Sequence, residues 1–160
     1  MKNIQRIMAC MDLSEYSKLT MEFATALSRG FMAKIIVLNV VNIKDIDTVT
    51  KAKRYYPDLI DPEFYTKKIR EERYQKIHRM VKKNFASDLN RMDLLVHVGI
   101  PFKTILQVAE SKKVDVLVLG NKGRGNVLGT LLGTTAEKVF RHSAIPVLSV
   151  RDRDRFRHQR

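Results

Sequence analysis

Short apolar runs alternate along the chain with longer amphipathic stretches. The runs are nearly continuous and rich in β-branched residues, as expected of strands covered on both faces; they span residues 4–11, 34–41, 94–98, 114–119 and 146–150. The stretches between them repeat apolar residues with a helical period and span residues 14–29, 63–90, 101–111 and 134–142. Such alternation predicts βαβ units and a doubly wound, parallel α/β sheet with helices on both faces.

Local signals mark where several of these helices begin or end. Gly30 follows the first helical stretch and is interpreted as its C-terminal stop. Pro101 stands in the first turn of the third stretch, where its missing N–H costs nothing. Thr134 and Glu137 have the spacing of a capping box, which places the N-terminus of the last helix at residues 133–135.

The middle segment, residues 42–92, departs from the compact pattern. Residues 42–62 read as a polar linker, and a long helix follows over residues 63–90. Its apolar stripe can face the sheet and consists of Ile69, Ile77, Val81, Phe85 and Leu89. Its basic positions are Lys67, Lys68, Arg70, Arg73, Lys76, Arg79, Lys82 and Lys83. The simplest interpretation of this basic face is a solvated helix surface, and an anionic partner is the alternative.

The length and composition of the chain favour a single domain with a short tail. The chain has 160 residues and a mass of 18.5 kDa, which we interpret as a domain over residues 1–150 and a basic tail over residues 151–160. The net charge is +13, of which +6 lies in residues 51–91 and +3 in the tail. A balance of this kind favours nucleic acid, an anionic surface or nucleotide phosphates as partners.

Other compositional features exclude several classes of protein. A single cysteine excludes an internal disulfide framework and a Cys-based zinc site, and the four histidines show no metal-ligand spacing. No apolar run approaches the length of a membrane-spanning helix. We therefore expect a cytoplasmic protein without a membrane span or a protein-held metal.

Glycines concentrate between the strand at residues 114–119 and the last helix. Residues 120–135 read GNKGRGNVLGTLLGTT. Glycine allows backbone N–H groups to converge on one ligand, and a helix N-terminus directly after the loop favours a phosphate. Lys122 and Arg124 add positive charge. The loop matches neither the P-loop nor the dinucleotide fingerprint, and the alternative interpretation is a flexible connector.

The spacing Gly120-x2-Gly123-x9-Gly133-Thr134 resembles the nucleotide-binding pattern of the universal stress protein family, in its ATP-binding branch. The opening MACMDLSEYSKLTMEFA and the closing GTTAEKVFRHSAIPVLSVR are similar to the first and last elements of that family. The resemblance implies a five-stranded sheet of order 3-2-1-4-5, an adenine-nucleotide alpha-hydrolase-like or Rossmann-like three-layer sandwich.

The resemblance also implies a set of ligand-binding residues. Asp12 and the backbone around Val40 would hold adenine and ribose, with Ala9 or Cys10 lining the base. The loop would hold the ribose and phosphates of ATP, with Mg²⁺ bound mainly by the phosphates, through Gly120, Lys122, Gly123, Arg124, Gly133, Thr134 and Thr135. The chain departs from the family at Asn121-Lys122 and at Leu13, where glycine is common.

Some of these residues have simpler interpretations. Asp12 directly precedes the first helix and is expected to cap it, with or without a ligand-facing role. Cys10 lies within the first strand and is interpreted as a small buried hydrophobic residue. His97 lies on an apolar strand and is interpreted as a core or sheet-edge residue.

The sequence favours a binding module over an enzyme. It contains no G-x-S-x-G, H-E-x-x-H or paired Cys–His signature, and no general base is evident beside the predicted phosphates. We expect an ATP-binding regulatory protein with at most slow hydrolysis, which dimerises through its last strand, residues 146–150, and serves an unidentified client. The alternative is an interaction protein that binds nucleic acid or another anionic partner through its basic helix and tail.

Overall fold

The computed structural model of the chain describes residues 3–121 and 133–152 and places five parallel strands in one sheet. The strands lie in the order β3-β2-β1-β4-β5, which confirms the predicted doubly wound topology. Their bounds are β1 (Arg6–Cys10), β2 (Lys34–Asn42), β3 (Met92–Gly99), β4 (Val116–Gly120) and β5 (Val147–Val150). β3 and β5 are therefore the two edges of the sheet.

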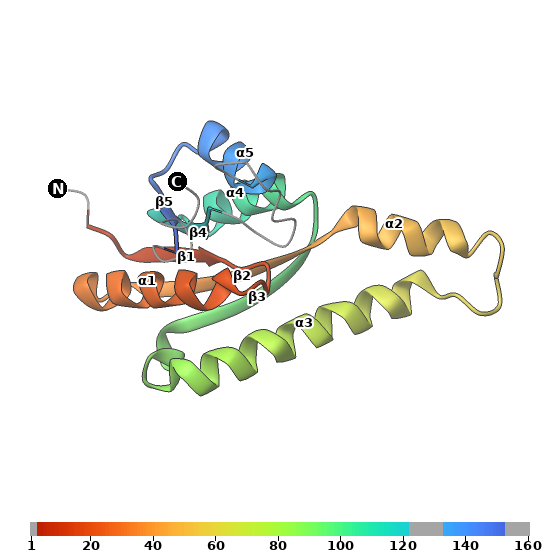
Figure 1. Cartoon of the computed structure of the whole chain (residues 1–160), viewed down its shortest axis with the longest axis horizontal. Coiled ribbons are helices and arrows are strands. Elements are labelled where there is room, and N and C mark those ends of the chain that lie inside the picture. Colours follow the sequence, from red (N-terminus) through yellow and green to blue (C-terminus); the bar gives the residue numbers. More distant parts are fainter. Residues whose placement is uncertain (1–2, 122–132, 153–160) are drawn as a thin grey trace.

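Helices cover both faces of this sheet, so the fold is the predicted Rossmann-like three-layer sandwich (Figure 1). Helices α1 and α3 lie on one face, and α4 and α5 lie on the other. The helical elements are α1 (Tyr16–Phe31), α2 (Ile43–Ala52), α3 (Pro62–Asn84), the 3₁₀ helix η1 (Ala86–Arg91), α4 (Pro101–Ser111) and α5 (Thr134–His142).

The two faces of the sheet carry separate apolar clusters. Alternate residues of β1 contribute to each: Ile7 packs with the α1 and α3 side, and Met8 packs with the α4 and α5 side. Leu117 and Val118 of β4 divide in the same way, and all four side chains are fully buried. Burial on both faces explains why the inner strands read as continuous apolar runs rather than alternating ones.

The first helix does not stop at Gly30, so that prediction was wrong. Gly30 lies within α1, and the C-cap is Met32 in the left-handed conformation, with φ 53°. The N–H of Ala33 donates to the carbonyl oxygen of Ser28 at 3.0 Å and closes the end of the helix. A Schellman-like ending needs the left-handed residue, and this chain supplies it with methionine instead of the preferred glycine.

The prediction of a polar linker over residues 42–62 was also wrong, because α2 occupies half of that segment. Asn42 caps the helix by accepting a hydrogen bond from the N–H of Lys44 at 3.1 Å. Ile46 is the one residue of the helix that is buried. A single buried anchor leaves so little apolar periodicity that the segment resembles a linker.

The long basic helix is shorter than the predicted 63–90. α3 ends at Asn84 because Phe85 leaves the helical region, with φ −138° and ψ 32°, and turns its buried ring into the core. The 3₁₀ helix η1 follows and buries Asp88, whose carboxylate accepts hydrogen bonds from the guanidinium groups of Arg29 and Arg91. This network ties the end of α3 to α1.

A long arm extends from the sheet. It consists of α2, the connection that follows it and the first turns of α3, which run alongside each other (Figure 1). Asp61 caps α3 by accepting hydrogen bonds from the N–H groups of Glu63 and Phe64 at 3.0 and 3.2 Å. Among residues 3–121 and 133–152, no helix is long and apolar enough to cross a membrane.

Candidate functional site

The carboxyl ends of β1 and β4 meet at the centre of the sheet. Cys10, the last residue of β1, pairs with Leu119 of β4 and with Leu38 of β2. The chain leaves β1 toward β2 on one side, and β4 lies on the other, so the strand order reverses here. Open α/β sheets bind ligands at such a switch point, which makes the turn after β1 and the loop after β4 the candidate site.

Asp12 organises the turn after β1. Its Oδ1 accepts hydrogen bonds from the N–H of Ser14 at 2.9 Å and from the hydroxyl of Ser17 at 3.2 Å. The N-cap of α1 is Glu15, which makes no side-chain cap. Asp12 therefore stabilises the turn ahead of the helix and is not the N-cap residue that the sequence suggested.

Leu13 adopts a strained backbone conformation in the same turn. Its φ is 62°, in the left-handed region that costs a non-glycine residue roughly 1–2 kcal/mol. The partly buried Leu13 side chain packs against the core beneath α1, which offsets part of that cost. The departure from glycine noted in the sequence therefore falls at the position where the turn needs a left-handed residue.

Asn39, on β2, holds this turn in place through a hydrogen bond, and the sequence analysis missed it. Its Nδ2 donates to the carbonyl oxygen of Met11 at 2.7 Å, and the N–H of Met11 donates to the carbonyl oxygen of Leu38 at 2.8 Å. Asn39 is 1% exposed, and its Oδ1 has no hydrogen-bond partner among the described residues. A single amide inside the apolar run KIIVLNVV was the available signal.

A hydrogen bond joins the two residues that flank the loop after β4. The N–H of Asn121 donates to the carbonyl oxygen of Val150 at 2.9 Å, and the carbonyl oxygen of Asn121 accepts from the N–H of Gly133 at 2.7 Å. Asn121 is 5% exposed, so this junction is buried. The bond from Gly133 brings the start of α5 to the end of β4, beside the β1 end of the site.

The capping-box interpretation of Thr134 and Glu137 was wrong, although the helix start was predicted correctly. Gly133 is the N-cap, and the N–H of Glu137 donates to its carbonyl oxygen at 2.9 Å. Thr134 is thus the first helical residue. Gly133 has no side chain to accept a hydrogen bond, and among the described residues no side chain caps the first-turn N–H groups of α5, which suits them to an anionic ligand.

The residues predicted to line the base occupy different surroundings. Ala9 is fully buried, and its side chain belongs to the core on the α1 side. Cys10 is half-buried on the α4 and α5 side, and burial of its thiol raises the pKa to about 12. Val40 is half-buried on that same side of β2. Cys10 and Val40 are therefore better placed than Ala9 to touch a ligand with their side chains.

Three predicted residues, Lys122, Gly123 and Arg124, lie outside the described residues. The remaining loop residues of the prediction, Gly120, Gly133, Thr134 and Thr135, are described, and each is at least partly exposed. Within residues 3–121 and 133–152, no cluster of three His, Cys, Asp or Glu side chains could hold a metal ion.

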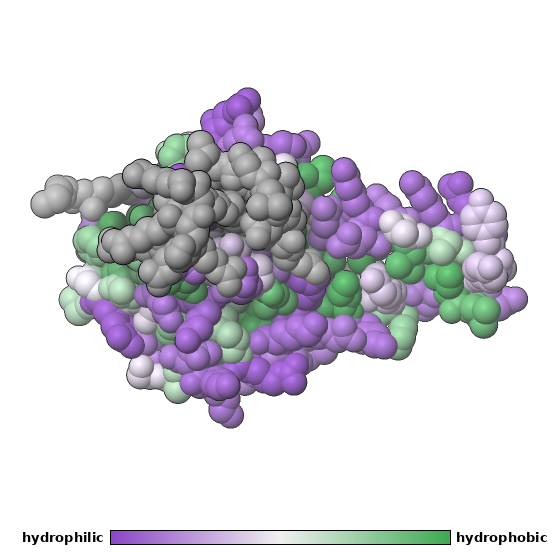
Figure 2. Space-filling view, viewed as in Figure 1, coloured by the Kyte–Doolittle hydropathy of each residue, from purple (hydrophilic) through white to green (hydrophobic). Residues whose placement is uncertain are grey.

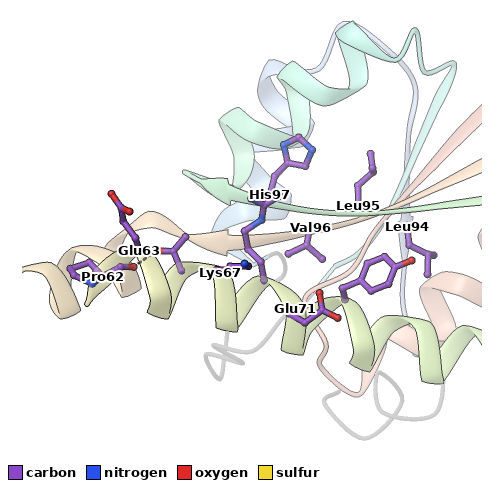
Figure 3. A pocket seen from close by; sticks show the side chains of 11 residues that line it. Pro62, Glu63, Lys67, Glu71, Leu94, Leu95, Val96 and His97 are labelled. Carbon is purple, nitrogen blue, oxygen red and sulfur yellow. Dashed lines mark hydrogen bonds between the residues drawn. The ribbon is translucent and has the colours of Figure 1, made fainter. Parts of the chain in front are cut away.

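A hollow lies between α3 and the outer strand β3 (Figure 3). It has a volume of about 640 Å³. Its lining includes the charged residues Glu63, Lys67 and Glu71 of α3 and the apolar residues Leu94 and Val96 of β3. It contains none of the residues predicted to bind nucleotide, so it belongs to a different surface.

The comparison with protein families decides the identity of this fold. The model of the universal stress protein family matches residues 3–151. The chain belongs to the universal stress protein family. The glycine spacing and the two terminal segments that suggested this resemblance lie within the matched residues.

Several relatives support the assignment over nearly their whole length. The chain is 27% identical over 158 residues to the universal stress protein MJ0577 of Methanocaldococcus jannaschii, covering 92% of this chain and 94% of the relative. It is 29% identical over 147 residues to a universal stress protein of Thermus aquaticus, covering 91% and 97%.

Solved structures repeat the fold. The structure of MJ0577 superposes with a TM-score of 0.79 at 25% identity, covering 95% of this chain and 99% of that one. A universal stress protein solved in complex with cAMP superposes with a TM-score of 0.61 at 22% identity, covering 93% and 98%.

Proposed function

We propose that this universal stress protein binds an adenine nucleotide where β1 and β4 end. The observation that carries the proposal is the hydrogen bond from the Gly133 N–H to the Asn121 carbonyl oxygen, which brings the uncapped N-terminus of α5 to the end of β4. Free N–H groups and the positive end of the helix dipole favour a phosphate. A relative of the same fold, solved with cAMP, supports an adenine nucleotide as the ligand.

The two halves of the site would take the two halves of the nucleotide. On the β1 and β2 side, Asp12, Cys10 and the backbone around Val40 would contact ribose and adenine. On the β4 side, Gly120, Gly133, Thr134 and Thr135 would contact the phosphates, together with Lys122, Gly123 and Arg124. A divalent ion such as Mg²⁺ would be bound mainly by the phosphates of ATP.

Isothermal titration calorimetry with ATP, ADP, cAMP and GTP tests this proposal. We expect binding of adenine nucleotides and weaker binding of GTP. Gly133→Val should abolish phosphate-dependent affinity, because a Cβ branch at the N-cap would crowd the approach to the first turn of α5. Gly30→Ala is the matched control, since a Cβ at Gly30 meets no atom within 4 Å. No heat with ATP at millimolar concentration in the presence of magnesium would refute the proposal.

The same site gives little support for efficient catalysis. The Oδ1 atom of Asp12 is engaged by Ser14 and Ser17, so this oxygen holds the turn after β1. We propose a cytoplasmic regulatory protein of the stress response that signals by binding, with hydrolysis slower than about one turnover per second, the lower end of ordinary enzymes. A faster turnover by the protein alone, measured by phosphate release, would favour an enzyme.

We also propose that β5 forms a sheet-edge dimer. β5 is an edge strand, and Leu148 on it is 36% exposed. Unpaired edge groups invite a second copy, and a two-fold axis would satisfy both edges. Leu148→Asp should yield monomers by light scattering in about 0.5 M salt, where charge contacts are screened. A wild-type monomer under those conditions would refute this contact.

Binding of nucleic acid or another anionic partner is the second candidate function. It is favoured by the exposed lysines of α3 and by the net charge of +13. Such binding should weaken steeply as salt rises, because counterions are released from the phosphates. Electrophoretic mobility shifts at two salt concentrations distinguish it from the salt-resistant sheet-edge dimer.

A further inference from the structure

The end of α2 and the turn that follows it combine exposed cations with exposed aromatic rings. We call residues 51–56, which read KAKRYY, the basic-aromatic segment. Its three cations are exposed, and its two aromatic residues are 80% exposed at Tyr55 and 59% exposed at Tyr56. Figure 2 shows hydrophobic and hydrophilic surface side by side on the outer part of the arm. Aromatic rings left outside the core, next to positive charge, are typical of a surface that binds an anionic partner with planar groups.

Backbone hydrogen bonds hold the basic-aromatic segment in a defined turn. The N–H of Arg54 donates to the carbonyl oxygen of Lys51 at 3.1 Å. The N–H groups of Tyr55 and Tyr56 both donate to the carbonyl oxygen of Ala52, at 3.0 and 3.2 Å. The backbone that carries the two rings is therefore ordered before a partner arrives, which lowers the entropy cost of binding.

A second group of cations lies on the neighbouring part of α3. We call Lys67, Lys68 and Arg70 the α3 cations; all three are exposed. Lys67 and Lys68 follow Phe64 by three and four residues, so they share its side of the helix. Phe64 is itself 65% exposed. Because α2 and the first turns of α3 run alongside each other (Figure 1), the outer arm carries both basic groups.

The carboxylates between these two basic groups do not cancel their charge. Asp58, Asp61 and Glu63 lie in the connection and the first turn of α3, and Asp61 is engaged as the cap of that helix. Residues 51–70 hold six cations against these three carboxylates, so the net charge is +3. In the described part of the chain, no ion pair joins any of the six cations to a carboxylate. The cations therefore remain for an anionic partner.

We propose that a single-stranded nucleic acid binds across the outer arm. Its phosphates lie against the basic-aromatic segment and the α3 cations, and its bases stack on Tyr55 and Tyr56. Such stacking needs unpaired bases, so a duplex loses this contact. The inference assigns a surface and a ligand class to the second candidate function, nucleic-acid binding, and rests on it. It does not depend on the nucleotide site.

The charges of the arm favour this ligand over two other occupants. A second copy of the chain would bring together two arms of the same positive sign, since α3, which also carries Glu71 and Glu72, has a net charge of +5. Insertion into an anionic membrane would bring Asp58 and Glu63 against the headgroups together with the neighbouring Leu59. A nucleic-acid strand needs only the two basic groups and the two rings.

Fluorescence anisotropy with labelled single-stranded RNA and DNA of about 12 nucleotides tests the role of the cations. Lys51→Ala with Lys53→Ala should weaken binding and lower the slope of log affinity against log salt by about 1.4. Each lost phosphate contact on a single strand accounts for about 0.7 of that slope. Lys103→Ala with Lys112→Ala, at exposed positions on α4 and directly after it, removes the same charge and should leave the slope nearly unchanged.

The two tyrosines separate stacking from charge. Tyr55→Ala with Tyr56→Ala should weaken binding of the single strand at least about fivefold and leave the salt slope unchanged, because no phosphate contact is lost. Tyr55→Phe with Tyr56→Phe keeps both rings and should bind like the wild type. A duplex of the same length should bind more weakly and should not respond to the alanine changes. Ultraviolet cross-linking followed by peptide mass spectrometry should attach the single strand to residues 55–56.

The outcomes separate this inference from the functions proposed above. Gly133→Val should bind the oligonucleotide like the wild type; loss of binding there would place the strand in the nucleotide site and overturn the inference. Equal binding by the wild type, the lysine variant and the tyrosine variant would leave nucleic-acid binding in place and overturn the arm as its surface. No binding by the wild type at about 50 mM salt would refute both. Sedimentation with phosphatidylserine vesicles but no oligonucleotide binding would replace nucleic acid by a lipid surface.

Discussion

The carboxyl edge of the sheet and the arm differ in how far their apolar side chains are buried. At the sheet edge most of the apolar residues are buried or half-buried, and the polar groups of Asp12, Asn39 and Asn121 bond to neighbouring turns and strands. On the end of the arm, residues 55–64, which we call the arm tip, the largest apolar residues face outward. A hydrophobic residue in the sequence therefore predicts burial in the sheet but not on the arm.

The largest difference between the two regions should appear in stability. Leu117, on β4, is fully buried, whereas Leu59, on the arm tip, is 84% exposed. Leu117→Ala should lower the free energy of unfolding by about 2–5 kcal/mol, and Leu59→Ala should change it by less than about 0.5 kcal/mol. Urea denaturation followed by circular dichroism measures both. A loss of stability in Leu59→Ala comparable to that in Leu117→Ala would show that the arm tip is packed within the chain.

The junction between α1 and the end of α3 should respond to acid. The guanidinium groups of Arg29 and Arg91 lower the pKa of buried Asp88 from 3.8 to about 2. A carboxyl group with a depressed folded-state pKa stabilises the protein above its unfolded-state pKa. This contribution, on the order of 1–2 kcal/mol, should therefore be lost as the pH falls from about 4 to about 2.

Asp88→Asn isolates that effect. The variant should be less stable than the wild type at pH 7, and the difference should shrink toward pH 2. Thermal unfolding at a series of pH values measures it. A difference that stays constant over this range would show that the charge of Asp88 does not stabilise the junction.

At the sheet edge, Asn39 allows stability and ligand binding to be tested separately. We expect it to position the site more than it stabilises the fold. Asn39→Leu removes the donor to Met11 but also removes an unpartnered buried oxygen, so the two effects on stability oppose each other. We expect unfolding free energy to change by less than about 1 kcal/mol, while nucleotide affinity falls about tenfold, equivalent to about 1.4 kcal/mol.

Thr25→Val is the matched control for Asn39. Thr25 is 3% exposed and carries a hydroxyl without a hydrogen-bond partner in the described part of the chain. It lies on α1, and no hydrogen bond among the described residues joins its side chain to the turn at Met11. Calorimetry should therefore show unchanged affinity in Thr25→Val. Equal losses of affinity and stability in Asn39→Leu would indicate a purely structural role.

The smallest expected effects concern the end of α1. Gly30→Ala should stabilise the protein by about 1 kcal/mol, because alanine is the better helix former and its Cβ meets open space. Met32→Gly should give a similar gain by relieving the left-handed conformation of a side chain that is 88% exposed. Melting temperatures measure both gains. Destabilisation by Gly30→Ala would imply that the helix does end at Gly30.

The sheet could be predicted from the sequence because its determinants are local. The runs that became β1, β2 and β4 are buried on both faces and are therefore apolar throughout. The strand order followed from the family resemblance. The errors lie at α2, which is held by a single buried residue, and at Phe85, where long-range packing ends a helix whose local pattern continues.

The candidate site could be predicted only in part. The spacing of the glycines pointed to the loop after β4, and Asp12 was marked by its place at the end of an apolar run. Asn39 was missed because its role depends on the neighbouring strand, which brings it to the carbonyl of Met11. The capping box failed for a similar reason: the N–H of Gly133 donates to the carbonyl oxygen of Asn121 at the end of β4, and Gly133 rather than Thr134 is the N-cap.

Nucleotide binding at the sheet edge is the central claim, and the small molecules carried by the purified protein test it most directly. Wild type and Gly133→Val would be purified in parallel, denatured, and their released small molecules identified by mass spectrometry. We predict that the wild type releases an adenine nucleotide at close to one molecule per chain and that the variant releases far less. A ligand of another chemical class, equal amounts from both proteins, or none from either would contradict the claim.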